Sequence, residues 1–519
     1  MSDPKLPRLP HGKGADIGLL LEGTYPYVSG GVSSWVHEII TGLPELSFGI
    51  VFIGSAPEDY KPIRYTLPSN LVHVETHYLS EQPTPRKMGS SKKKQHDFDQ
   101  LAKLHDEFRK PGADISESLR EAVGKIETAD GIGWRDFLYS DETWHQICAS
   151  YHKFCTSPSF VDYFWSVRTM HGPLFKMGEI AAAVPPFKVL HSVSTGYAGF
   201  LGSLLQQRRQ CPFILTEHGI YTKERKIDLA NADWIKDARE ELSSGLEEDR
   251  TYVRRLWVRF FEDIGRLAYA GADPIISLFE GNRQRQVVDG APQVRTRVIP
   301  NGIDQGRFTP TARRKGEKVP HVLGLIGRVV PIKDIRGFIR AMRGVVAALP
   351  DAEGWIVGPE DEDPDYAREC HELVRSLGLE GRVKFLGFQK PDEIFPKMGL
   401  TVLTSISEAL PLVVLESFAS GVPVVATDVG SCRELIEGRL PEDRALGAAG
   451  AVIPIAAPDE AASAMVKLLK DPMAWFRARE AGLARVNTYY TRQQMFDAYR
   501  GVYKTALEAA RGGHRVRAS

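Results

Sequence analysis

Two glutamates, Glu408 and Glu416, stand eight residues apart in the C-terminal third of the chain. An ionised carboxylate only accepts hydrogen bonds, so such a pair suits a ligand with several hydroxyl groups, such as a sugar or a ribose. Eight residues of continuous helix correspond to about 12 Å of rise and about 80° of rotation. Pro411 favours a first helical position, which places Glu408 in the preceding loop. We therefore expect two carboxylates at one end of a sheet that do not face the same substrate atom.

Two cations, Arg328 and Lys333, stand where the first strand predicted for the second half of the chain ends. A lysine is a compact charge for a phosphate, and the planar arginine fork binds a phosphate through two parallel hydrogen bonds. The helix predicted after Pro411 adds unpaired N–H groups and partial positive charge at its N-terminus. The sequence therefore predicts a site where these groups converge on one pyrophosphate beside carboxylates that bind hydroxyls. A nucleotide sugar carries both kinds of group.

The first half of the chain offers two further candidates. Gly30 and Gly31 lie between a short apolar strand and an amphipathic helix, where a glycine loop lets a ligand approach the backbone closely. They do not form the GxGxxG dinucleotide fingerprint. His218 follows a predicted strand at the carboxyl edge of a parallel sheet, where open α/β folds bind ligands. Taken alone, the glycines are explained by a turn and His218 by a hydrogen-bonded core histidine.

Alternating strand and helix patterns surround these residues and predict an α/β protein with doubly wound parallel sheets. A chain of 519 residues exceeds what one core usually supports, so more than one domain is expected. We predict a first domain at 1–305 with a helical insertion at about 80–178, and a second at 306–488. A final helix at 489–519 is expected to cross back to the first domain.

The composition excludes several classes of function. Sixty-six basic and 66 acidic residues give no net charge, so nucleic acid is not an expected partner. Five cysteines without a CxxC pair argue against a disulfide framework or a zinc site. The acidic run Asp361–Asp365 is predicted to be a solvated turn and not a metal site. Neither an apolar signal segment nor a run of about 18 apolar residues is present, so we expect a cytoplasmic protein.

Several motifs in order resemble the GT-B glycosyltransferases of family 4. They are Ser29-Gly-Gly31, Asn301-Gly-Ile-Asp304, Arg328-x4-Lys333, Ser407-Glu-Ala-Leu-Pro411 through Glu416, and Gly421-x-Pro-Val-Val-Ala-Thr-x-x-Gly430. The resemblance covers nearly the whole chain apart from the insertion. The stretch Leu20–Trp35, together with that insertion, further resembles the cytoplasmic glycosyltransferases of Pel-type exopolysaccharide systems.

This resemblance implies a GT-B fold, in which two Rossmann-like domains face a central cleft, and a retaining reaction without a metal. It implies that the first domain, 1–305 with its insertion, binds the acceptor and that the second, 306–488, binds the nucleotide sugar. It implies that Lys333 and Arg328 neutralise the donor diphosphate, that Glu416 binds the ribose, and that Glu408 holds the sugar. It further implies that His218 hydrogen-bonds the donor sugar, so that Glu408, Lys333, Arg328 and His218 form the catalytic set. The remaining implied contacts to the nucleotide sugar come from Gly30, Gly31, Phe388, Ala409, Leu410, Pro411 and Leu412.

The resemblance implies transfer from UDP-glucose or a UDP-N-acetylhexosamine to a growing exopolysaccharide, with no cofactor. Because a polymer must be exported, inner-membrane protein partners at the cytoplasmic face are expected. Two alternatives stay open: a transferase similar to starch or sucrose synthases, and a non-catalytic nucleotide-sugar scaffold. The presence of Lys333, Arg328, Glu408 and Glu416 argues against the scaffold. A glycosidase is disfavoured, because about 12 Å exceeds the ~5 to 9.5 Å between the carboxylates of such enzymes.

Overall fold

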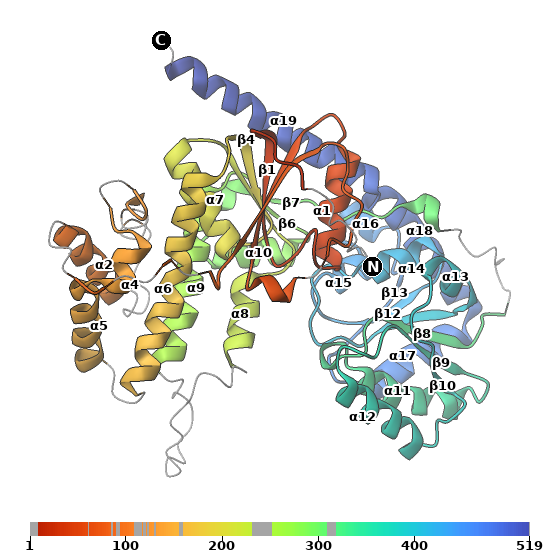
Figure 1. Ribbon diagram of the computed structural model, residues 1–519. Helices are drawn as coiled ribbons and strands as arrows, with labels where there is room; N and C mark the ends of the chain where they lie inside the picture. Colours follow the sequence, from red (N-terminus) through yellow and green to blue (C-terminus); the bar gives the residue numbers. More distant parts are fainter. Residues whose placement is uncertain are drawn as a thin grey trace, which may run out of the picture. The chain divides into compact units, whose positions relative to one another are not determined.

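The computed structural model describes residues 9–517 apart from the gaps at 61, 82, 85–86, 90–93, 108–116, 118–120, 122–123, 129–130, 155–158, 231–251 and 309–317. The chain forms two compact units (Figure 1). Unit 1 comprises residues 1–277, 283–297 and 499–519, and unit 2 comprises residues 278–282 and 298–498. Our predicted boundaries lie at residues 305 and 488, while these units divide the chain at 298 and 499.

Unit 1 is built on a seven-stranded sheet with the strand order β3-β2-β1-β4-β5-β6-β7. The strands are β1 Ala15–Glu22, β2 Phe48–Gly54, β3 Leu71–Tyr78, β4 Phe187–Ser192, β5 Phe213–Glu217, β6 Ile275–Ser277 and β7 Thr296–Val298. The pairs that join β1 to β6 are all parallel. Every residue of β2 is buried, as expected for a parallel strand that is covered on both faces. The carboxyl ends of these strands therefore meet at one edge of the sheet.

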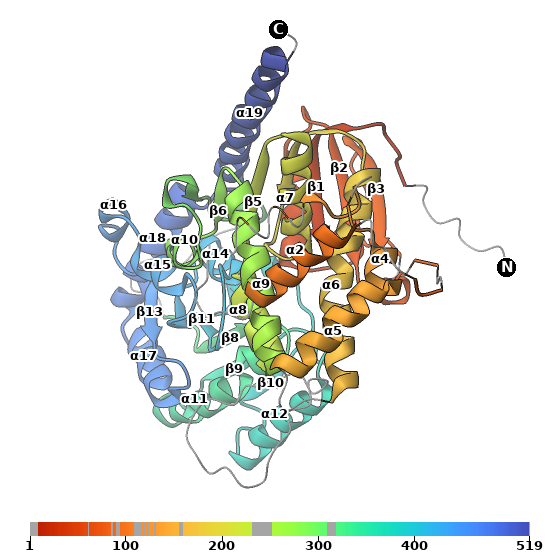
Figure 2. The same cartoon turned by 90° about the vertical axis from the view of Figure 1, so that its left-hand side faces the viewer.

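A helical segment separates β3 from β4. Its helices are α2 Gln95–Glu107, α4 Trp134–Tyr139, α5 Asp141–Phe154 and α6 Phe160–Ala183. Figure 2 shows α2, α4 and α5 gathered beside α6. The predicted insertion ends at about residue 178, within α6, which continues to Ala183 because the good helix formers Ala181 to Ala183 precede the prolines that follow.

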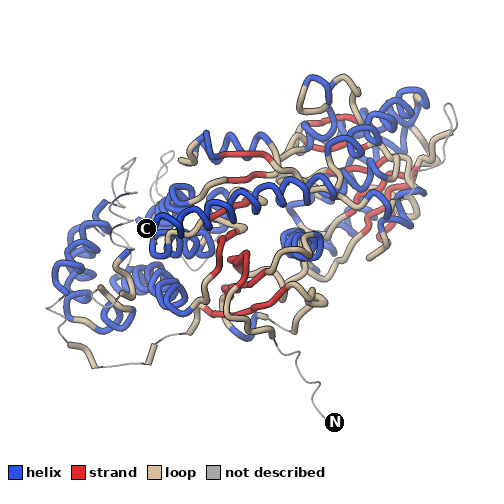
Figure 3. The backbone as a smooth tube through the Cα atoms, turned by 90° about the horizontal axis from the view of Figure 1, so that it is seen from above, coloured by secondary structure: helices blue, strands red, loops and turns tan. Residues whose placement is uncertain are grey.

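The other helices of unit 1 connect its strands. They are α1 Gly31–Gly42, α7 Tyr197–Arg209, α8 Tyr221–Ala230, α9 Tyr252–Gly271 and α10 Glu280–Val288, of which residues 280–282 belong to unit 2. The final helix, α19 Arg492–Arg517, is one continuous helix (Figure 3), and its residues from Tyr499 onward belong to unit 1. There the hydroxyl of Tyr503 lies 2.7 Å from His191 Nδ1 of β4, and the hydroxyl of Tyr499 lies 3.1 Å from Thr216 Oγ1 of β5. Buried polar contacts thus fasten the end of the chain to this sheet.

Unit 2 contains a six-stranded parallel sheet with the order β10-β9-β8-β11-β12-β13. Its strands are β8 Val322–Ile326, β9 Glu353–Val357, β10 Val383–Phe385, β11 Leu400–Leu403, β12 Val424–Thr427 and β13 Gly450–Ile453. Its helices are α11 Ile335–Ala348, α12 Pro364–Ser376, α13 Pro391–Ile394, α14 Leu412–Ala419, α15 Cys432–Glu437, α16 Pro441–Arg444, α17 Pro458–Lys470 and α18 Pro472–Tyr489. The order reverses between β8 and β11, which is where doubly wound sheets bind their ligands.

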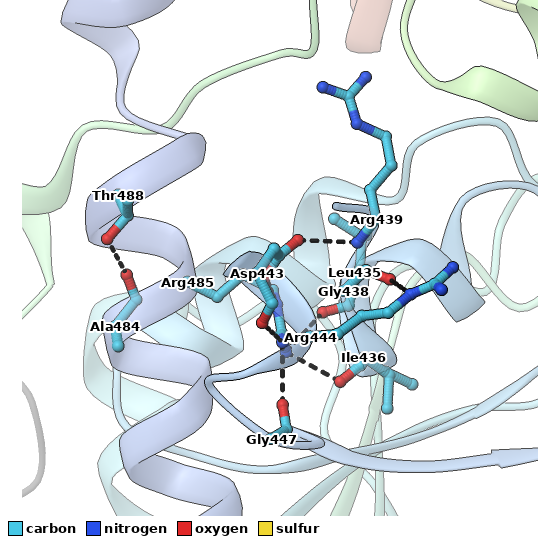
Figure 4. A network of polar contacts seen from close by, with 10 residues as sticks. All are labelled: Leu435, Ile436, Gly438, Arg439, Asp443, Arg444, Gly447, Ala484, Arg485 and Thr488. Carbon is cyan, nitrogen blue, oxygen red and sulfur yellow. Dashed lines mark hydrogen bonds and ion pairs between the residues drawn. The ribbon is translucent and has the colours of Figure 1, made fainter. Parts of the chain in front are cut away.

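A buried arginine fastens α18 to the segment around α15 and α16 (Figure 4). The side chain of Arg485 is fully buried, and its Nε donates to Asp443 Oδ1 at 2.5 Å. Its two terminal nitrogens donate to the carbonyls of Leu435, Ile436, Asp443 and Gly447 at 2.8 to 3.3 Å. Every nitrogen of the guanidinium therefore has a partner inside the protein.

Within the described ranges, no helix combines the length and the apolar character needed to cross a membrane.

Candidate functional site

Lys333 and Glu408 meet at the edge of the unit 2 sheet where the strand order reverses. Lys333 ends a short 3-10 helix, Pro331–Lys333, after β8, and Glu408 lies in the loop after β11. The Nζ atom of Lys333 lies 2.5 Å from Glu408 Oε1, and the hydroxyl of Ser405 donates to the same oxygen at 2.6 Å. The Lys333 and Glu408 side chains keep 20% and 12% of their exposure. The two residues predicted to serve phosphate and sugar thus form one partly open ion pair.

Three loops are tied together around this pair. The hydroxyl of Thr404 lies 2.9 Å from the carbonyls of both Lys333 and Asp334, and that of Thr427 donates to Ser405 O at 2.6 Å. Gly430 has a φ of +54°, and a Cβ there would lie 2.4 Å from the Glu408 carbonyl. Only glycine allows this close approach, so the last glycine of the Gly421–Gly430 motif fixes the loop that carries Glu408.

Arg328 holds a different carboxylate. Its Nη1 contacts Glu362, with the longer of the two contacts at 2.6 Å, and both side chains are about half exposed. An exposed pair of this kind is worth about 1 kcal/mol or less, so a ligand phosphate can displace Glu362. The structure therefore places Arg328 and Lys333 on one loop without joining them to a common partner. The predicted acidic turn supplies Glu362, and its Asp363 caps α12 by accepting from Tyr366 N at 3.0 Å.

Glu416 lies on helix α14, whereas Glu408 lies in the loop before that helix. Pro411 is its N-cap and Leu412 its first residue, so the prediction of Pro411 as the first helical residue is wrong by one position. The φ of Pro411 already suits a helix, but its ψ of 109° is extended. Glu416 is half-buried, and no hydrogen bond or ion pair of its carboxylate is present in the described part of the chain. Burial raises the pKa of Glu416, and Arg307 opposes that shift.

The other unit 2 residues that were predicted to contact the nucleotide sugar differ in how exposed their side chains are. Pro411 and Leu410 are buried, whereas Ala409 and Leu412 are half-buried at the start of α14. Phe388 is 79% exposed and follows β10, so it is accessible to a flat ligand such as a nucleobase. Of the first backbone N–H groups of α14, that of Val414 donates to Pro411 O at 3.1 Å, whereas those of Leu412 and Val413 have no backbone acceptor in the described part of the chain and are available to an anion.

In unit 1, His218 lines a cavity of about 420 Å³ at the carboxyl ends of the strands. The ring is nine-tenths buried and lies edge-on to Trp35 at 4.7 Å. Burial lowers the pKa of His218 to about 4, so the ring is neutral at physiological pH. Among the described residues its Nε2 has no hydrogen-bond partner, so the reading of His218 as a hydrogen-bonded core residue does not hold for this atom.

Gly30 and Gly31 begin α1 beside the same cavity, which Val32 also lines. The φ of Gly30 is 168°, an extended value open to any residue. A Cβ at either glycine would meet nothing within 4 Å. Neither backbone strain nor packing within the described part of unit 1 therefore requires glycine at these positions. Their predicted contact with the donor stays a prediction.

The sequence-based site omits residues that the structure brings to it. Ser405 and Thr404 directly follow β11, and a hydroxyl at a strand end next to Glu408 would have been the signal for them. Arg307 and Glu362 come from distant segments and leave no local signal. In unit 1, Glu22, Thr24 and Ser194 line the cavity beside His218, and their positions after β1 and β4 could have indicated them.

Two family models match the chain. Residues 15–294 match the family described as domain of unknown function (DUF3492), and residues 320–471 match the family described as glycosyl transferases group 1. The second match covers β8 to β13, and so the loops that carry Lys333, Arg328, Glu408 and Glu416.

Curated relatives share parts of the chain. A Streptomyces coelicolor protein named exopolysaccharide phosphotransferase is 35% identical over 162 residues, which is 30% of this chain and 16% of that protein. The D-inositol 3-phosphate glycosyltransferase of Geodermatophilus obscurus is 31% identical over 284 residues, or 50% of this chain and 58% of the relative. This chain thus spans little more than half the length of such relatives, and much less of the first.

Solved structures show a similar fold over nearly the whole chain. The HepE protein of Anabaena in complex with UDP has a TM-score of 0.57 at 16% identity, covering 94% of this chain and 100% of that one. The sucrose-phosphate synthase of Thermosynechococcus elongatus has a TM-score of 0.55 at 18% identity, covering 95% and 99%. At these identities the likeness concerns the fold alone, and it confirms the predicted GT-B class with two Rossmann-like parallel sheets.

Proposed function

Because the chain belongs to the DUF3492 family and also matches the group 1 glycosyltransferase model, we propose that it is a glycosyltransferase with a UDP-sugar as donor. The observation that carries the proposal is the Lys333–Glu408 pair at the reversal point of the unit 2 sheet. It brings a cation for a phosphate and an acceptor for hydroxyls to one place beside the N-terminus of α14. HepE, which has a similar fold, has been solved with UDP and with UDP-glucose.

In this proposal different residues of unit 2 bind different parts of the sugar donor. Lys333 and Arg328 bind the diphosphate, and each exchanges its present carboxylate partner for phosphate oxygens. The free carboxylate of Glu416 accepts hydrogen bonds from the ribose, and Glu408 accepts from the donor sugar. Ser405, by donating to Glu408 Oε1, keeps that carboxylate oriented once Lys333 turns to the phosphate.

The proposed sugar transfer depends on stabilising the negative charge of the departing diphosphate. As the bond between the anomeric carbon and the diphosphate oxygen breaks, negative charge grows on the diphosphate, where Lys333, Arg328 and the α14 N-terminus stabilise it. The acceptor hydroxyl forms the new bond on the face that the diphosphate leaves, and its proton passes to the departing phosphate. This sequence retains the anomeric configuration. Since the protein's own cations supply the positive charge, the proposal requires no metal.

The finer assignment is a PelF-like enzyme of a Pel-type exopolysaccharide system. Its support is the Leu20–Trp35 stretch, the helical insertion and relatives named for exopolysaccharide and lipopolysaccharide synthesis. In that assignment UDP-glucose or a UDP-N-acetylhexosamine extends a polysaccharide at the cytoplasmic face of the inner membrane, with membrane proteins as partners. The starch- or sucrose-synthase-like alternative differs in the acceptor, which is then a soluble sugar.

The test is release of the nucleoside diphosphate by the purified full chain from UDP-glucose, UDP-N-acetylglucosamine and UDP-N-acetylgalactosamine, and from ADP-glucose and GDP-glucose, with and without EDTA. We expect UDP release from at least one donor, unchanged by EDTA and lost in Lys333→Ala. Lys467→Ala, which removes an exposed lysine from α17, is the matched control and should behave as the wild type. UDP binding without release from any donor would favour the scaffold. Turnover of ADP- or GDP-sugars alone would overturn the choice of UDP.

A further inference from the structure

Arg328, one of the two cations assigned to the donor diphosphate, already has a carboxylate partner. Its Nη1 contacts both carboxylate oxygens of Glu362, and the longer of the two contacts is 2.6 Å. The Arg328 side chain is 55% exposed and the Glu362 side chain is 48% exposed. Glu362 comes from the loop after β9, whereas Arg328 lies in the loop after β8. A phosphate that approaches Arg328 from solution therefore has to compete with this carboxylate.

The backbones of these two loops are hydrogen-bonded to each other on either side of the arginine. Gly327 N donates to Val357 O at 2.9 Å, and Val329 N donates to Pro359 O at 3.0 Å. A Cβ at Gly358 would lie 2.0 Å from the carbonyl oxygen of Gly327, so only glycine allows this close approach. The loop after β9 is thus held beside the arginine by the fold itself and not by the ion pair.

The segment that carries Glu362 is also fixed on both sides of that residue. Glu360 Oε2 lies 2.7 Å from His371 Nε2 of α12, and Asp363 Oδ1 accepts from Tyr366 N at 3.0 Å in the first turn of the same helix. Because its neighbours are anchored, the Glu362 carboxylate loses less conformational entropy on pairing with the arginine than one on a free loop would.

Glu362 differs from Glu408, the carboxylate that pairs with Lys333. Glu408 also accepts from the Ser405 hydroxyl at 2.6 Å, and we propose that it binds the donor sugar. No hydrogen bond or ion pair of Glu362 other than that with Arg328 is present in the described part of the chain. The proposed function also gives Glu362 no part of the donor to bind. An ionised carboxylate repels a diphosphate, so the effect of Glu362 opposes diphosphate binding.

We infer that Glu362 competes with the diphosphate for Arg328, and that this competition weakens the binding of the released nucleoside diphosphate and speeds its departure. The inference rests on the proposed function, which assigns Arg328 to the diphosphate. Breaking the bond to the sugar leaves additional negative charge on the terminal phosphate, which strengthens its attraction to the two cations. The return of Glu362 to Arg328 offsets this attraction and favours release of the product.

Calorimetric titration of the full chain with UDP and with inorganic pyrophosphate tests this inference. We expect Glu362→Gln to bind both ligands about two- to fivefold more tightly than the wild type, because Arg328 then has no ion pair to exchange. Glu369→Gln is the matched control. Glu369 pairs with Arg336 at 3.0 Å, both side chains are about half exposed, and neither residue belongs to the proposed donor site. This control should bind both ligands as the wild type does.

The gain in affinity should depend on Arg328. In an Arg328→Met background, Glu362→Gln should give little or none of the gain, because no ion pair remains to be broken. A stopped-flow chase of mant-labelled UDP by excess UDP measures the release step. Release from Glu362→Gln should be slower than from the wild type by about the same factor as the gain in affinity.

Four results would each overturn the inference: equal or weaker UDP affinity in Glu362→Gln, an equal gain in Glu369→Gln, the same gain without Arg328, or an unchanged release rate. UDP binding without the gain would leave the proposed donor standing. Tighter pyrophosphate binding by Glu362→Gln without UDP binding by either protein would uphold the competition for Arg328 and overturn UDP as the donor nucleotide. Binding of neither ligand by the wild type would overturn both.

Discussion

Buried polar groups are fully hydrogen-bonded in one region of this molecule, whereas in another some of them have no partner among the described residues. In unit 2 the fully buried Arg485 satisfies all its nitrogens with Asp443 and neighbouring carbonyls (Figure 4). In unit 1 the cavity leaves Thr24, Ser194 and His218 with unpaired atoms among the described residues. Desolvating a polar atom is costly in both places, but only the Arg485 network compensates that cost internally. The difference separates a network that is satisfied within the protein from a cavity whose polar atoms have no partner among the described residues.

The Lys333–Glu408 pair stands between these extremes. Its atoms are paired, yet both side chains keep part of their exposure, unlike those of Arg485 and Asp443 at 0% and 3%. A pair that solvent reaches can exchange its partner for a ligand, whereas a dry pair cannot do so without unfolding its surroundings. Exposure therefore distinguishes the ion pair that we propose binds the donor from the buried pair of Arg485 and Asp443.

The largest effect is expected for Arg485→Met. The substitution leaves the Asp443 carboxylate buried without its cation, a loss that typically costs about 3 to 5 kcal/mol. Calorimetric thermal unfolding should show a transition at clearly lower temperature. Arg433→Met is the control, because Arg433 forms exposed pairs with Asp428 and Glu437 and should change stability by about 1 kcal/mol or less. If the two substitutions lowered the unfolding temperature equally, the Arg485 network would not have the structural role that we assign to it.

A smaller effect is expected for His218→Gln, and it depends on pH. The folded state lowers the pKa of His218 from 6.5 to about 4, so the unfolded state takes up the proton first as the pH falls. The free energy of unfolding therefore decreases between pH 6.5 and about 4 by up to about 3 kcal/mol, and it levels off below that range.

His218→Gln should lose this part of the acid sensitivity, as measured by denaturant unfolding at pH 7, 5.5 and 4. His191 contributes its own acid-dependent loss in both proteins, because burial also lowers its pKa, to about 3. His145→Gln, at an exposed position on α5, should leave the pH dependence unchanged. A variant as acid-sensitive as the wild type would show that His218 is not held neutral by burial.

The smallest effect is expected for Ser194→Ala. Because its hydroxyl has no partner among the described residues, its removal should change the free energy of unfolding by less than about 1 kcal/mol. Ser417→Ala is the contrasting variant, since the buried Ser417 hydroxyl contacts Val422 O at 2.8 Å and Thr401 Oγ1 at 2.7 Å. Its loss should cost roughly 1 to 3 kcal/mol. If Ser194→Ala costs as much, the Ser194 hydroxyl supports the fold and the comparison fails.

Much of the fold was predictable because its signals are local. Apolar runs such as Leu400–Leu403 suit buried parallel strands, and their alternation with helices predicts parallel sheets. The same logic placed Lys333 and Glu408 at one sheet edge, where the structure shows them in contact. The start of α14 was missed by one residue, because helix limits depend on φ and ψ values that the sequence encodes weakly.

The partners of the site residues were not predictable. Arg328 takes Glu362, 34 residues away, because the loop after β9 approaches it in space. Gly430 is required by the carbonyl of Glu408, a contact between two loops that no local pattern encodes. The polar atoms of the unit 1 cavity that lack a hydrogen-bond partner among the described residues can be recognised only once burial is known. In the sequence, a residue such as Thr24 looks like an ordinary loop residue.

Calorimetric titration with UDP tests the central claim, that the loops after β8 and β11 bind the diphosphate of a UDP-sugar through Lys333. The account predicts that the wild type and the exposed-lysine control Lys467→Ala bind UDP equally. It predicts that Lys333→Ala binds about tenfold or more weakly, since it loses a charge-assisted contact to phosphate. Undiminished UDP affinity in a folded Lys333→Ala protein would contradict the account.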